Sequence, residues 1–343
     1  MDFQIALILG QDGVTNGAIY ALLALVLAFA VTRVIFIPQG EFVAYGALTL
    51  VALQSGKLPG TLWLLIVAGV LVALIDGIAA ARARSWRRLA PIAGWNLALP
   101  LALWAVLQAL PVAEAPMPLQ ILLALAVVVP LGPMIYRLAY QPLAEASVLV
   151  LLIVSVAVHV VMVGLGLLAF GAEGSRTPPF TEASFEIAGM SVASQTLWVI
   201  GCSLALIAGL YLLFERTLYG KALRATAVNR QGARLMGIPT ALAGKLTFFL
   251  CALIGAFSGV LIAPITTVYY DTGFLIGLKG FVAAIIGGLV SYPVAAVGAV
   301  LVGLLESYSS FWASAYKEVI VFTLIIPVLL WRSLTTHHVE EEE

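Results

Sequence analysis

The chain has 343 residues, of which 62% are hydrophobic and only 10% are charged, and its formal net charge is zero. Soluble domains carry about 25% charged residues, so this composition excludes an ordinary soluble protein. The balanced charge gives no reason to expect a nucleic-acid partner. The sequence indicates an all-α membrane protein that crosses the bilayer many times.

Apolar runs define the expected elements, because a helix needs about 20 apolar residues to cross a bilayer. Residues 187–214, 246–270 and 280–305 contain no Asp, Glu, Lys or Arg. We expect about eleven helical membrane segments: 8–32, 40–56, 61–81, 92–111, 117–136, 147–170, 194–214, 241–263, 276–290, 294–311 and 317–332. The second, ninth and tenth segments are short, so we expect them to be re-entrant or broken and to border the path of a transported molecule.

The distribution of Lys and Arg predicts the orientation, since cytoplasmic loops are enriched in both. One side of the expected segments holds Arg33, Arg82, Arg84, Arg87, Arg88, Arg137, Arg216, Lys221, Arg224, Arg230, Arg234 and Arg332. The other side holds Lys57, Arg176, Lys279 and Lys317. The N-terminus is therefore expected outside and the C-terminus in the cytoplasm, with a polar extracytoplasmic loop at 171–193 and a polar tail at 334–343.

Residues 215–239, ERTLYGKALRATAVNRQGARLMGIP, form a basic island between two apolar spans. Helical periodicity predicts one amphipathic helix at the cytoplasmic surface, with Arg230 and Arg234 opposite an apolar face. The apolar positions are Leu218, Ala222, Ala225, Val228, Gly232, Leu235 and Met236. From the residues alone, such a helix either lies on anionic headgroups or docks another protein.

The ionisable candidates within expected membrane segments are Glu41, His159 and Glu306, with Asp76 and Asp271 nearer the edges; such groups are costly in a membrane and often functional. A proton-coupled carrier would use them as a relay, but they occur one per segment with no repeated spacing, which favours packing roles. Gly255 and Gly259 form a GxxxG pair, which indicates close helix packing within the chain or, alternatively, at a subunit interface.

No residue pattern supports catalysis or a bound cofactor. The sequence has no GxxxxGK[ST] motif, no Ser-His-Asp set and no metal-binding cluster, and its cysteines, Cys202 and Cys251, lie in apolar runs. We therefore expect no catalytic site, no metal and no cofactor in this chain, and an enzyme is a weak alternative. If transport uses ATP, another chain must bind it.

Several stretches, in order, resemble the permeases of branched-chain amino-acid ABC transporters, the LivH type. They are NGAIYALLALVLAF, PQGEFVAYGA, YRLAYQPLAEAS, GKALRATAVNRQGARLMGI, GFLIGLKGFVAAIIGGLVSYPVAAVGAVLVGLLES and YKEVIVFTLIIPVLL. The shared order covers most of the chain and is more specific than any one motif. The resemblance implies a single permease domain, over 1–343, of a binding-protein-dependent importer in the bacterial inner membrane.

The resemblance also implies the partners. An extracytoplasmic solute-binding protein would deliver the ligand, facing 171–193. A second permease, of the LivM type or another copy of this chain, would complete the path, and two ATPase subunits would carry ATP and Mg²⁺. The helix at 215–239 would then be the coupling helix, which favours protein docking over headgroup binding. The expected coupling residues are Lys221, Arg224, Asn229, Arg230, Arg234, Leu235 and Gly237.

Candidates for the translocation path come from the glycine-glutamate element that opens the second segment and from the glycine-rich stretch after residue 272. They are Gln39, Gly40, Glu41, Gly273, Gly277, Lys279, Gly287 and Gly288. The stretch 264–280 is expected to form either an outer gate or a packed extracytoplasmic turn.

The sequence departs from the family pattern in two places. Gln39 stands where the family often has a histidine before Gly-Glu, which argues against proton transfer there. The similarity also fades at 57–116, which reads as an added hairpin. The expected ligands are branched-chain or other hydrophobic amino acids; urea, short amides and small aromatic acids are alternatives within this importer type, and an ion-coupled secondary transporter is the alternative from another class.

Overall fold

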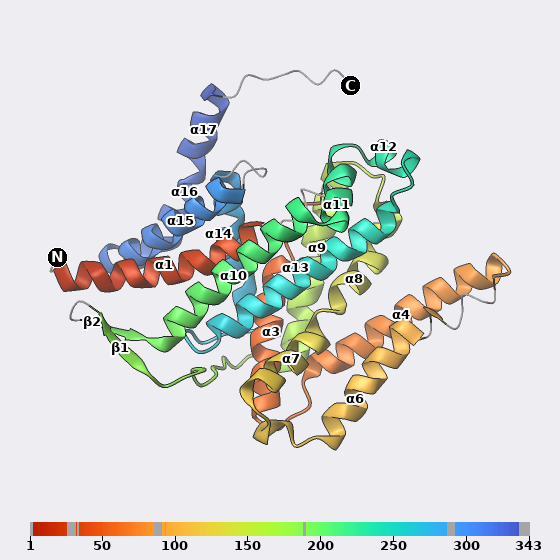
Figure 1. The fold of residues 1–343 in the computed structure, drawn as a ribbon, viewed down its shortest axis with the longest axis horizontal. Helices are drawn as coiled ribbons and strands as arrows, with labels where there is room; N and C mark the ends of the chain where they lie inside the picture. The colour runs from red at the N-terminus through yellow and green to blue at the C-terminus, as the bar shows by residue number, and fades with distance from the viewer. Residues whose placement is uncertain are drawn as a thin grey trace.

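Apolar helices form most of the molecule (Figure 1). The computed structural model describes residues 3–25, 32, 34–85, 91–92, 94–187, 190–286 and 292–335. Its α-helices are α1 (Phe3–Leu25), α3 (Gln39–Gln54), α4 (Gly60–Arg82), α6 (Leu99–Ala109), α7 (Met117–Val128), α8 (Leu131–Ile135), α9 (Val148–Phe170), α10 (Ser194–Arg216), α11 (Leu218–Val228), α12 (Arg230–Leu235), α13 (Thr240–Ile262), α14 (Thr272–Ile286), α15 (Tyr292–Trp312), α16 (Lys317–Thr323) and α17 (Ile325–Thr335). Short π or 3-10 segments lie at η2 (Gly94–Ala98), η3 (Val112–Glu114), η4 (Tyr136–Tyr140), η5 (Gln141–Leu143) and η6 (Ser314–Tyr316).

Helices occupy all of the expected membrane segments within the described residues, which confirms the fold class. In the part of the chain that the structure describes, seven helical stretches are long and apolar enough to cross a membrane. They are Gly60–Arg82, Met117–Leu143, Val148–Phe170, Ser194–Arg216, Thr240–Ile262, Val294–Trp312 and Ser314–Trp331. The second segment, α3, has 16 residues and the ninth, α14, has 15, so both are short, as expected.

Proline and capping residues set many of the helix boundaries. Pro59, Pro116 and Pro239 immediately precede α4, α7 and α13, where a missing backbone N–H costs no helical hydrogen bond. Ser147 caps α9, because its Oγ accepts a hydrogen bond from the Val150 amide at 3.4 Å. Gly171 ends α9 with a φ of +80°, a conformation that favours glycine. These residues therefore account for the positions at which several helices begin and one ends.

The buried centre consists of α3 packed against α13 and α14, beside the antiparallel pair α1 and α15 (Figure 1). Glycines allow these helices to approach backbone to backbone. A Cβ on Gly259 would lie within 1.9 Å of the Val43 carbonyl oxygen, and one on Gly255 within 2.7 Å of the Phe42 Cβ. The GxxxG pair thus packs within this chain, on α3.

Helices α4 and α6 form a hairpin at one edge of the molecule (Figure 1). It lies within the stretch 57–116, for which the sequence analysis predicts an added hairpin, and α4 also contacts α7, α8 and α9. Arg137 Nη2 lies 2.5 Å from Asp76 Oδ1, which ties the last third of α4 to η4, the segment that follows α8. The hairpin is therefore bonded to the rest of the bundle.

The polar loop at 171–193 contains an antiparallel β-hairpin, an element that the sequence analysis did not anticipate. Strands β1 (Ser184–Ile187) and β2 (Met190–Ala193) pair with Ser184 opposite Ala193. Figure 1 shows this hairpin at one end of α10 and the helices α11 and α12 at the other. Residues 171–193 and 215–239 therefore lie at opposite ends of the bundle.

Candidate functional site

Helix α3 begins inside the bundle rather than at its surface. A Cβ on Gly255 would lie 2.9 Å from the Gln39 carbonyl oxygen, and Gly255 is about two-thirds of the way along the 23-residue helix α13. Helix α3 starts at Gln39, directly after Pro38. Because α13 is long enough to span a bilayer, the first turn of α3 lies at membrane depth.

The first turn of α14 meets the first turn of α3. A Cβ on Gly40 would come within 2.1 Å of the Gly273 carbonyl oxygen and 3.2 Å of the Gly277 Cα. A Cβ on Gly273 would in turn lie 2.1 Å from the Gly40 carbonyl oxygen. The structure thus brings together three of the residues expected on the path. They come from segments that are far apart in the sequence.

Glu41 projects from this junction toward the middle of α9. Its side chain has no solvent exposure, and His159 Nδ1 lies 3.0 Å from its Oε1. The angles at this contact are not those of a hydrogen bond, so neither oxygen of Glu41 has a hydrogen-bond partner in the described part of the chain. His159 and Glu41 are therefore close together but not hydrogen-bonded. The His159 ring stacks on Phe274 of α14, with the ring centroids 4.6 Å apart.

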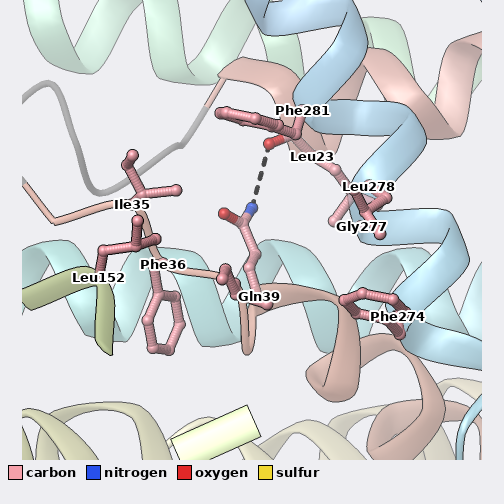
Figure 2. A pocket seen from close by; sticks show the side chains of 10 residues that line it. Leu23, Ile35, Phe36, Gln39, Leu152, Phe274, Gly277, Leu278 and Phe281 are labelled. Atoms are coloured by element: carbon pink, nitrogen blue, oxygen red, sulfur yellow. Dashed lines mark hydrogen bonds between the residues drawn. The ribbon is translucent and has the colours of Figure 1, made fainter. Parts of the chain in front are cut away.

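A cavity of about 340 Å³ lies beside the same junction (Figure 2). Its walls come from the end of α1, the segment 34–38, the first half of α9 and α14. Gln39 supplies the polar side chain of the lining, and its Nε2 donates a hydrogen bond to the Leu23 carbonyl oxygen at 3.2 Å. The Gln39 Oε1 is buried without a hydrogen-bond partner among the described residues.

Lys279 does not line this cavity. Its Nζ donates hydrogen bonds to Glu306 Oε1 at 2.5 Å and Glu318 Oε1 at 3.1 Å, and the side chain is buried. The Tyr20 hydroxyl donates to the other oxygen of Glu306 at 2.5 Å. This cluster joins α14 to α15, α16 and α1. Lys279, one of the four basic residues placed outside by sequence, is therefore a buried ion-pair partner and not a loop charge.

Gly287 and Gly288, the other two residues expected on the path, lie outside the described residues. The cavity-lining side chains Ile35, Leu152 and Phe274 were not singled out by sequence. Each is an ordinary apolar residue within an apolar run, so no local signal marks it. Only the meeting of the segment 34–38 with α9 and α14 makes these residues neighbours.

The stretch 215–239 forms two short helices, which differs from the single helix expected. Helix α10 continues to Arg216, and Thr217 caps α11 by accepting a hydrogen bond from the Gly220 amide at 3.0 Å. Asn229 interrupts the helix and caps α12, its Oδ1 accepting from the Gly232 amide at 2.7 Å. Gly237 follows α12 with a φ of +80° and turns the chain toward α13.

The apolar face of these two helices is exposed. Its most exposed members, which we call the apolar docking face, are 82–88% exposed. They are Leu218, Val228, Leu235 and Met236. Lys221 is exposed as well, whereas Leu223 and Ala233 are buried against the bundle. Exposed apolar patches on a folded protein commonly mark interaction surfaces.

The arginines of this stretch are bonded to the chain itself. Arg230 Nη1 donates to the Ala144 carbonyl oxygen at 2.7 Å, and Arg234 Nη1 donates to Glu145 Oε1 at 2.7 Å. The Arg234 hydrogen bond and charge lower the pKa of Glu145. Arg224 Nη2 donates to the Phe214 carbonyl oxygen at 2.6 Å and lies 2.8 Å from Glu215. Helices α11 and α12 are thereby fastened to the end of α10 and to the loop before α9.

The opposite end of the bundle is fastened in the same manner. Ser175 and Val268 form an isolated antiparallel bridge, with both backbone hydrogen bonds at 2.9 Å. Arg176 Nε donates to the Pro264 carbonyl oxygen at 2.8 Å. Residues 264–271 thus form a packed turn bonded to the loop 171–193, and the rest of the stretch 264–280 is the first half of α14. Within the described residues no cluster of three or more His, Cys, Asp or Glu side chains could hold a metal ion.

A family described as "Branched-chain amino acid transport system / permease component" matches residues 94–329. LivH, the high-affinity branched-chain amino acid transport system permease protein of Escherichia coli K12, is 25% identical over 93% of this chain and 91% of its own length.

Two further relatives match over shorter ranges. The BraD permease protein of Pseudomonas aeruginosa is 29% identical over 59% of this chain and 68% of its own length. A probable LivH of Methanocaldococcus jannaschii is 29% identical over 57% of this chain and 67% of its own length. No solved structure matches the chain.

Proposed function

Because the chain belongs to the permease components of branched-chain amino acid transport systems, we propose that it is one membrane subunit of an ATP-driven, binding-protein-dependent importer for branched-chain or other hydrophobic amino acids. The family match over 94–329 is the observation that supports this proposal most strongly. The chain carries no nucleotide-binding motif, so ATP and Mg²⁺ belong to partner chains. This subunit contributes the path and the surfaces that receive its partners.

The apolar docking face of α11 and α12 is the proposed seat of an ATPase subunit. It is largely exposed, and the hydrogen bonds of Arg230 and Arg234 hold it in a fixed position against the loop 144–147. A push on these helices would therefore reach α9, which begins at Val148. Among the residues expected to couple, Leu235 and Lys221 point outward, whereas Arg224, Arg230, Arg234 and the cap Asn229 position the helices.

The other partners are assigned by placement. The β-hairpin end would face the extracytoplasmic solute-binding protein, which puts the N-terminus outside and the C-terminus in the cytoplasm of a bacterial inner-membrane protein. A second permease, either a LivM-type chain or another copy, would complete the path. Within this chain the path would run past the junction of Gln39, Gly40 and Glu41 with Gly273 and Gly277.

Purification from the native membrane followed by mass spectrometry tests the assembly. We expect two P-loop ATPase chains and a second permease chain with each complex, and uptake in reconstituted vesicles that requires ATP. Uptake by this chain alone, driven by an ion gradient, would instead establish the secondary-transporter alternative. Measuring the uptake of leucine, urea and benzoate by the same vesicles separates the ligand alternatives.

The docking surface is tested by Leu235→Asp, which places a charge on an 88% exposed apolar position. We expect the ATPase chains to be lost from the purified complex while this chain stays folded. Phe185→Asp, on the exposed strand β1 at the opposite end, is the matched control and should retain the ATPases. Loss of the ATPases in both variants, or in neither, would contradict this assignment.

Charge reversal at Glu173, Glu182 and Glu186 tests the binding-protein surface, since all three side chains are exposed. We expect a higher concentration of binding protein to be needed for half-maximal uptake. Unchanged uptake at low binding-protein concentration would refute this docking surface.

A further inference from the structure

We propose that the cavity beside Gln39 is a binding site, within this chain, for the side chain and the ammonium group of a small apolar amino acid in transit. The proposal rests on the proposed importer function and adds to it a defined position on the path. It also excludes two of the alternative ligand classes.

The size and lining of the cavity fit an aliphatic side chain. Its volume of about 340 Å³ is near the lower end of pockets that bind small molecules, which span roughly 300–1,000 Å³. Ile35, Leu152, Phe274 and Phe281 are among the apolar groups in its walls (Figure 2). A ligand without an apolar portion, such as urea, would leave these walls uncovered and gain little from entering.

One polar atom in the cavity lacks a partner among the described residues. The Gln39 amide nitrogen is committed to the Leu23 carbonyl oxygen, so the amide oxygen is left as a free acceptor. In Figure 2 this oxygen points away from Leu23, toward the side of the cavity formed by Ile35 and Phe36. Gln39 is only 3% exposed, and a buried acceptor without a donor is unfavourable. A ligand that brings an N–H group would satisfy it.

The surrounding charge selects a cationic donor. Among the described residues no Lys, Arg or His side chain lines the cavity, and Lys279 is already bonded to Glu306 and Glu318. Glu41, two residues after Gln39, has its Oε1 3.0 Å from Nδ1 of His159, whose ring stacks on the cavity-lining Phe274. An ammonium group can donate a hydrogen bond to the Gln39 Oε1, whereas an anion in the cavity would have no cationic partner among the described residues. A small aromatic acid without an amino group therefore fits poorly.

Cysteine protection in the complete transporter tests the site. Cys202 and Cys251 are the chain's native cysteines, so a Cys202→Ser, Cys251→Ala background removes native thiols from this subunit. Leu152→Cys then places a thiol in the cavity wall. Leu168→Cys, on the same helix α9 but 83% exposed, is the matched control. The rate of labelling by N-ethylmaleimide is measured in native membrane vesicles with and without leucine.

We expect leucine to slow labelling several-fold at position 152 and to leave position 168 unchanged. Urea and benzoate should protect neither thiol. Equal labelling at 152 with and without leucine, or equal protection at both positions, would overturn the proposal. Protection by urea instead of leucine would overturn the ligand class. A separate uptake assay shows whether transport requires the ATPase chains. Failure of the proposed importer function would appear in that assay, whereas failure of the proposed site would appear only in the labelling experiment.

Two substitutions at Gln39, each made in the Leu152→Cys background, test whether ligand binding depends on the acceptor oxygen or only on the packing of this side chain. Gln39→Glu keeps an oxygen acceptor and loses the donor to Leu23, whereas Gln39→Leu loses both. We expect leucine protection of the thiol introduced at position 152 to persist in Gln39→Glu and to disappear in Gln39→Leu. The labelling rate without leucine should be similar in both variants, which checks that the cavity is intact. Full protection in Gln39→Leu would exclude a role for the amide oxygen.

Discussion

Gly40 and Gly273 pack backbone against backbone, so that a Cβ on either residue would come within 2.1 Å of the other's carbonyl oxygen. Their helices start at this contact, one after Pro38 and the other after the packed turn that ends at Asp271. The contact sets the position of Gln39 and Glu41 relative to Phe274. The geometry of the candidate path therefore depends on the absence of two side chains.

Gly273→Ala should destabilise the bundle, because the added methyl group meets backbone and not a movable side chain. Overpacking of this kind typically costs about 1–3 kcal/mol. We expect a lower melting temperature of the purified subunit and reduced uptake. Gly164→Ala, in α9 where no atom lies within 4 Å of the new Cβ, is the control and should melt no lower than wild type.

Lys279→Met should be strongly destabilising, since it leaves Glu306 buried without its cationic partner. Removal of one partner from a buried ion pair costs about 3–5 kcal/mol. Thermal melting should show the loss, and Lys279→Met combined with Glu306→Leu should recover part of it because the stranded charge is gone. Lys57→Met removes an exposed lysine and should leave the melting temperature unchanged. A melting curve of Lys279→Met that matches wild type would contradict this role.

Exchange of charges between Arg234 and Glu145 tests whether the ion pair matters, as opposed to either residue by itself. Arg234→Glu and Glu145→Arg each place like charges at a contact of 2.7 Å. We expect each single variant to lower substrate-stimulated ATP hydrolysis, because α12 loses its connection to the loop before α9. The double variant restores opposite charges and should regain much of the activity. Failure of the double variant to improve on either single variant would show that the pairing is not what matters.

The same pair predicts the pH range over which this connection holds. Arg234 lowers the pKa of Glu145 below its ordinary value of 4.5, so the favourable contribution is fully present above pH 4.5 and is lost as the pH falls through the lower value. Between neutral pH and pH 4.5 the connection should be unchanged. In ATPase assays, the ratio of wild-type to Arg234→Gln activity should therefore stay constant over this range, because this substitution adds no titrating carboxyl group. A ratio that approaches one within it would contradict the assignment.

The membrane segments could be predicted from the sequence, because a helix that crosses the bilayer needs a long apolar run. Glu41 could be singled out because a carboxylate in such a run is conspicuous. The break at Asn229 could not be predicted, because the apolar periodicity of α11 continues across this residue in ALRATAVNRQGARL. The structure shows that the asparagine side chain caps α12, so one helix ends there and the next begins.

The cavity was beyond sequence reasoning for a different reason. Leu152 and Phe274 lie in separate apolar runs, and nothing local distinguishes a residue that faces lipid from one that faces a void. The partner of Lys279 was equally hidden, because Glu306 is 27 positions away on another helix. Both features arise only when helices distant in the sequence pack together.

The dependence of α3 on α13 and α14 has a consequence for how the protein is made. A 16-residue helix that begins at membrane depth and carries a buried carboxylate is a poor substrate for insertion by itself. Its packing partners are synthesised about 200 residues later, so α3 lacks its contacts with α13 and α14 until that part of the chain has been made. Termination of synthesis anywhere before Thr240 would leave α3 without its main packing partners, and the surface left exposed would make such fragments prone to aggregation.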